Sequence, residues 1–156
     1  MWGKTRTLEG GLKFLKLWQA GALAAAMPWA AMAAPSGLTV STPWMRYLLP
    51  NIPAGGYMIL KNASDADVVV TGASSPACGM LMLHKSDESS GMASMTDVQR
   101  VTVPAHGSVS FAAGGYHLMC MQPRMHVDGR VEVTLQFLGG DSMVVLMPVY
   151  GVAGAP

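Results

Sequence analysis

The chain has 156 residues, a length typical of a single domain. Hydrophobic residues make up 51% of it and charged residues only 12%, a composition typical of a well-buried core and not of a disordered chain. Ten Lys and Arg residues nearly balance nine Asp and Glu residues, and no basic cluster occurs beyond the N-terminal segment. We therefore expect no nucleic-acid partner, since phosphate binding requires a basic face.

The first 33 residues predict a secretory signal peptide. Basic residues precede an apolar run over residues 17–31, and small residues follow it, with the predicted cleavage after Ala33. Gln19 and Pro28 interrupt the run, whereas a stable membrane span needs about 20 clean apolar residues. We therefore expect residues 34–156 to form one exported domain with no permanent membrane anchor.

The exported part predicts an all-β domain. Short apolar or alternating runs are separated at close intervals by Gly, Pro, Asn, Asp and Ser, and no stretch has helical periodicity. Nine or ten short strands in about 120 residues favour an antiparallel sandwich or barrel, because a parallel sheet would need crossover helices. The expected strands cover residues 38–40, 44–48, 56–62, 67–73, 79–85, 96–103, 108–112, 116–121, 131–138 and 142–149.

Methionine is unusually abundant, and two of the expected strands combine it with histidine. Successive side chains of a strand point to opposite faces. In the first of these strands, Leu81 and Leu83 therefore share one face, and in the second, Leu118 and Cys120 share one face. If these apolar residues mark the core, the histidine and methionine side chains on the opposite face of each strand point outward. Taken singly, each could be an ordinary core or surface residue, but the joint pattern indicates a metal site. The outward set is Met80, Met82, His84, His117, Met119 and Met121.

The donor atoms of this set favour Cu(I). Thioethers and imidazoles suit that ion, whereas Mg²⁺ and Ca²⁺ prefer carboxylate oxygens. Zinc is less favoured because thioethers are not among its usual ligands. In an oxidising compartment, a thioether can also hold Cu(I) without being lost to disulfide formation.

Four residues have a spacing that resembles the H-x10-M-x21-H-x-M motif of the periplasmic copper chaperones of the PCuAC family. Similar stretches are residues 54–58 with Asn62, residues 75–77 and residues 114–119, and the resemblance covers nearly the whole exported part. It implies a cupredoxin-like Greek-key β sandwich with a shallow Cu(I) site near solvent. The motif positions, and hence the implied copper ligands, are His84, Met95, His117 and Met119.

The resemblance also implies a function: a periplasmic metallochaperone, not an enzyme, that delivers copper to the binuclear copper centre of cytochrome c oxidase. The partner would be the copper-site subunit or another assembly chaperone. Met92 is an alternative to Met95, because the intervening loop is rich in Gly and Ser and could shift the register. Asp87 and Glu88 are the nearest carboxylates expected around the ligands, and we assign them to solvation of that loop.

Two features depart from the family pattern. Residues 151–156 lack the His- and Met-rich tail that would add a Cu(II) site, and Cys78 and Cys120 stand where apolar residues are more usual. Two cysteines in an exported chain usually pair. Cys78 shares the outward parity of His84 unless Gly79 resets the alternation. We expect a disulfide, with a redox role or a free Cys120 that binds copper as the alternatives.

Other functions fit less well. An electron-transfer cupredoxin needs Cys, His and Met in close succession, whereas Cys120 is followed by Met125 and then His126. The sequence contains no nucleophile elbow, the motif that would indicate a hydrolase. Periplasmic copper storage or tolerance, and a β-sandwich interaction module without metal, remain as alternatives to copper delivery.

Overall fold

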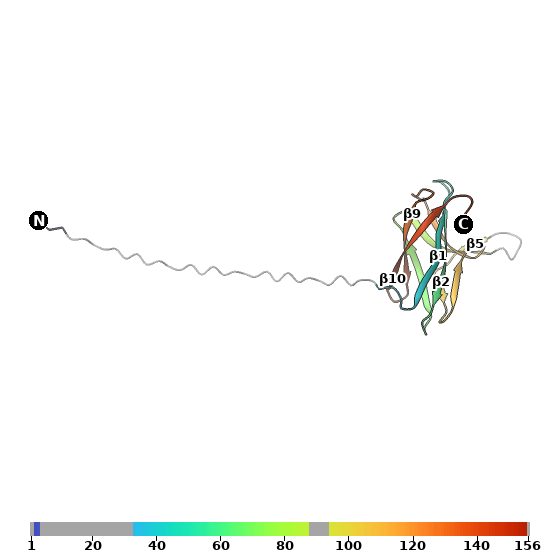
Figure 1. The fold of residues 1–156 in the computed structure, drawn as a ribbon, viewed down its shortest axis with the longest axis horizontal. Helices are drawn as coiled ribbons and strands as arrows, with labels where there is room; N and C mark the ends of the chain where they lie inside the picture. The colour runs from blue at the N-terminus through green and yellow to red at the C-terminus, as the bar shows by residue number, and fades with distance from the viewer. Residues whose placement is uncertain (1, 4–32, 88–93, 156) are drawn as a thin grey trace. The chain divides into compact units, whose positions relative to one another are not determined.

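The structure, a computed structural model, describes residues 2–3, 33–87 and 94–155. The part of the chain that it describes contains ten strands (Figure 1), which confirms the all-β prediction. No helix among these residues has the length and apolarity needed to cross a membrane. Almost all of the predicted signal peptide lies outside the described residues. The strands are β1 (Leu38–Arg46), β2 (Ala54–Asn62), β3 (Val68–Ser74), β4 (Met80–Asp87), β5 (Ser94–Asp97), β6 (Val101–Val103), β7 (Ser108–Phe111), β8 (Tyr116–Met121), β9 (Arg130–Phe137) and β10 (Ser142–Tyr150).

Two of the predicted strand boundaries are wrong. The separate strands expected at residues 38–40 and 44–48 form the single strand β1, whose pairing with β2 shifts register between Ser41 and Trp44. Thr42 lies in this bulge with a φ of 46°, a conformation that disrupts alternation without ending the strand. The single strand expected at residues 96–103 divides into β5 and β6, because β5 pairs with β4 whereas β6 pairs with β3.

The strands form one continuous sheet in the order β5-β4-β8-β7-β2-β1-β10-β9-β3-β6. Its pairings are antiparallel except those of β1 with β10 and of β7 with β8. The parallel pairing of β1 with β10, which lie side by side in Figure 1, joins the two halves of the sheet. The sheet curls so that both halves contribute to one core.

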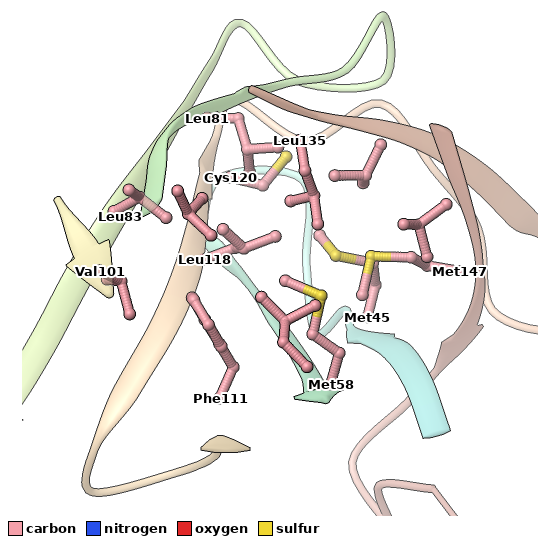
Figure 2. Close-up of a cluster of buried hydrophobic side chains, with 14 of the residues drawn as sticks. Met45, Met58, Leu81, Leu83, Val101, Phe111, Leu118, Cys120, Leu135 and Met147 are labelled. Carbon is pink, nitrogen blue, oxygen red and sulfur yellow. The ribbon is translucent and has the colours of Figure 1, made fainter. Parts of the chain in front are cut away.

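Part of the methionine excess belongs to this core. Met45, Met58 and Met147 are at most 1% exposed and lie among the buried side chains in Figure 2. Leu81 and Leu83 of β4, with Leu118 and Cys120 of β8, are buried in the same cluster. The core therefore fixes which face of β4 and β8 points inward.

A disulfide joins Cys78 to Cys120, as predicted, with a distance of 5.4 Å between their Cα atoms. It excludes a free Cys120 as a copper ligand. Cys78 precedes β4, and the Gly79 amide donates a hydrogen bond to the Met121 carbonyl at 2.9 Å. Because the strand begins only at Met80, its alternation does not determine the direction of Cys78, which packs against the core.

Candidate metal site

His and Met residues on the outer faces of β4 and β8 lie opposite one another in register. The two strands are antiparallel neighbours, and directly opposed residues in such strands have Cβ atoms about 4.5–5.5 Å apart. All six residues share the face opposite to the buried leucines, which confirms the predicted parity. We call this set the soft ladder; its three rungs are Met80 with Met121, Met82 with Met119 and His84 with His117.

The two histidines are less accessible than the sequence indicates. Although both lie on the outer face, His84 is only 8% exposed and His117 only 7%. Their rings are close neighbours, with centroids 5.8 Å apart and planes inclined at 66°. On its other side, His84 is flanked by Asp97 of β5, its partner in the pairing of β4 with β5.

A backbone contact sets the tautomer of His117. Its Nδ1 lies 3.1 Å from the carbonyl oxygen of Gly115. Because a carbonyl can only accept, Nδ1 carries the proton and donates it. Nε2 then keeps its lone pair, which is the arrangement that metal-binding histidines commonly adopt.

A carboxylate that the sequence analysis missed contacts His84. Oδ1 of Asp97 lies 2.6 Å from Nε2 of His84, although the angle is not that of a hydrogen bond. The expectation that Asp87 and Glu88 are the nearest carboxylates is therefore wrong for the described residues; Glu88 lies outside them. An oxygen donor matches Cu(I) poorly, so Asp97 is better suited to orienting His84 than to binding copper.

Met95 lies on β5, a strand and not the expected loop. It pairs with Ser86 of β4, diagonally from His84, and its side chain is 62% exposed. Met95, His117 and Met119 line one open hollow of about 320 Å³, whereas His84 is not on its wall. The alternative ligand Met92 lies outside the described residues.

Met82 is a second thioether that the motif does not include. It lies directly opposite Met119 and adjoins His84 on the same face of β4. The alternation of the strand had already placed it in the outward set, and the structure adds that its direct neighbour is Met119. The soft ladder and Met95 together offer imidazoles and thioethers without a thiolate, a donor set that fits Cu(I).

Comparisons with known proteins identify the family and the fold of the chain. The model of the LpqE-like family, described as "Putative lipoprotein LpqE-like", matches residues 38–149. A curated relative from Leifsonia xyli subsp. xyli (strain CTCB07), named "Putative lipoprotein Lxx21020", is 29% identical over 122 residues, which are 76% of this chain and 73% of the relative.

Solved structures show the same fold. The copper-bound PCuAC domain from PmoF2 is 21% identical, with a TM-score of 0.61 over 74% of this chain and 93% of that domain. The solution structure of Cu(I)-bound DR1885 from Deinococcus radiodurans is 32% identical, with a TM-score of 0.54 over 83% of each chain. The chain thus belongs to the LpqE-like family and has the β fold of PCuAC domains.

Proposed function

We propose that this protein is a Cu(I)-binding metallochaperone whose copper ligands are His84, Met95, His117 and Met119. The observation that carries the proposal is the in-register pairing of His84 with His117 on the outer face, next to Met119. The donor chemistry favours Cu(I) over harder ions. The relation to DR1885, whose solved structure is described as its Cu(I) form, supports the same ion.

The protein acts in the cell envelope, and specifically in the periplasm after removal of residues 1–33. The description of the family as lipoproteins supports an envelope location. The Cys78–Cys120 disulfide fits an oxidising compartment, since cytosolic proteins rarely keep such bonds.

The uneven exposure of the ligands suits transfer of the metal. Met95 is mostly exposed, whereas the two histidines are almost buried. An incoming acceptor can therefore replace the Met95 thioether first and the imidazoles last, without unfolding the domain. Handing over an ion in this way needs no acid or base, so the protein is not an enzyme. The acceptor is the binuclear copper centre of cytochrome c oxidase, reached directly or through another assembly chaperone.

The delivery role can be tested in a deletion strain grown with scarce copper. We expect lower cytochrome c oxidase activity and less copper in the oxidase, both restored by the wild-type gene and not by a gene encoding His84→Ala with His117→Ala. Unchanged activity and copper content would contradict delivery. Sensitivity to excess copper in the same strain would then favour storage or tolerance.

Replacing Asp97 with Asn is expected to weaken Cu(I) binding. Asp97, whose Oδ1 lies 2.6 Å from Nε2 of His84, is positioned to orient the ring, and loss of such an outer partner typically costs about 10–100-fold in metal affinity. Competition with a chromophoric Cu(I) chelator measures the change. Asp65→Asn is the matched control, because Asp65 also contacts a histidine, His106 at 2.8 Å, in an exposed turn. An equal loss in both variants would indicate a general charge effect.

A further inference from the structure

Two rungs of the soft ladder continue beyond the histidine pair. Met80 lies opposite Met121, and Met82 lies opposite Met119. Core packing explains Met45, Met58 and Met147, but it does not explain Met80, whose side chain is 58% exposed. The ladder contains four methionines, and the proposed copper site uses only one of them, Met119. The other three are Met80, Met82 and Met121.

The three unused methionines are close enough to share one ion. The Cβ atoms of an opposed pair such as Met80 and Met121 lie about 4.5–5.5 Å apart. Met82 is two residues further along the same face, about 6.6 Å at 3.3 Å per residue. Methionine has three rotatable bonds before its terminal methyl group, so the sulfur atoms can converge above the strands.

The disulfide holds this end of the ladder in register. Cys120 directly precedes Met121, and Cys78 lies two residues before Met80, so the cross-link borders the outermost rung. The hydrogen bond from the Gly79 amide to the Met121 carbonyl fixes the same rung from the backbone. The backbone positions of Met80 and Met121 are therefore constrained before any metal binds.

We propose that Met80, Met82 and Met121 form a second Cu(I) site, built from thioethers alone, beside the histidine-containing site. Soft sulfur donors select Cu(I), and the absence of imidazole together with the exposure of Met80 makes this site the weaker and faster-exchanging one. It would receive copper at the end of the ladder farthest from the histidines, where its own ligand Met82 lies opposite Met119 of the histidine-containing site. The inference extends the copper binding proposed above.

Anaerobic titration of the purified protein with Cu(I), against a chelator of known affinity, tests the second site. We expect the wild type to bind two equivalents of Cu(I), one strongly and one more weakly. In the variant Met80→Leu with Met121→Leu, the affinity for the strong equivalent should stay within about twofold of the wild-type value, and the weaker equivalent should be lost. Met143→Leu on β10, outside the ladder, is the matched control and should keep both. A wild type that saturates at one equivalent, or a Met80→Leu, Met121→Leu variant that still binds two, overturns the proposal.

A second measurement locates the weaker ion and does not depend on the folding of a variant. In the wild type labelled with ¹³C at the methionine methyl groups, the second equivalent should shift the signals of Met80, Met82 and Met121. Shifts confined to other methionines would contradict the site. The variant His84→Ala with His117→Ala separates the two proposals: it should lose the strong equivalent and keep the weaker one, so either site can fail without the other.

Discussion

Replacing His84 and His117 together with Ala is expected to weaken the strong Cu(I) site by on the order of 10⁴-fold. Loss of a partner outside the coordination sphere typically costs about 10–100-fold, so loss of a ligand should cost at least about 100-fold for each histidine. The two rings are adjacent, with centroids 5.8 Å apart, and one of them is already held in a metal-binding tautomer by Gly115. The two other histidines, His106 and His126, lie in loops and not on β4 or β8.

Chelator competition measures this loss, and circular dichroism checks that the variant is folded, because both histidines are nearly buried. His106→Ala is the control: that imidazole lies in an exposed turn beside Asp65, away from the ladder. X-ray absorption of the reduced, copper-loaded protein adds an independent count of nitrogen and sulfur donors. Wild-type affinity in the double variant, or a copper shell without nitrogen, would show that the histidines are not ligands.

The parity of the candidate site could be predicted because it depends on local geometry alone. Alternation along a strand is a property of the backbone, so Leu81 and Leu118, as core residues, were enough to place His84 and His117 on the opposite face. The motif spacing added Met95, which lies on the neighbouring strand β5 and not on the expected loop.

The rest of the site depends on which strands pair, and in what register. β4 and β8 are far apart in the sequence, and only their pairing shows that Met82 lies opposite Met119. Likewise, Asp97 reaches His84 because β5 folds back onto β4 with these two residues opposed. The burial of the histidines follows from the same neighbours, so no local pattern could have indicated it.

Boundaries of strands were missed for a related reason. Thr42 has a positive φ that interrupts alternation inside β1, and a sequence pattern shows such a bulge as the end of a strand. Between β5 and β6 the sequence pattern is continuous, yet the two segments have different partners: β5 pairs with β4, whereas β6 pairs with β3. Both cases are set by contacts with partner strands.

Reducing the Cys78–Cys120 disulfide is expected to lower the free energy of unfolding by about 4 kcal/mol at 25 °C, the chain-entropy value for a loop closed across a sequence separation of 42 residues. Without the cross-link, the unfolded chain gains conformations while the folded core keeps the same side chains. Urea unfolding of the oxidised and the reduced wild type measures the difference.

The variant Cys78→Ala with Cys120→Ala separates the cross-link from packing. Cys120 is fully buried, so removing its sulfur also leaves a cavity, and this variant should be less stable than the reduced wild type. Equal midpoints for the oxidised and the reduced wild type would contradict a stabilising bond. Because the disulfide borders the rung of Met80 and Met121, this double Ala variant, which adds no thiolate to compete for Cu(I), should also lose more affinity at the thioether site than at the histidine site. The tautomer and neighbours of the histidines are set by Gly115 and Asp97 at the other end of the ladder.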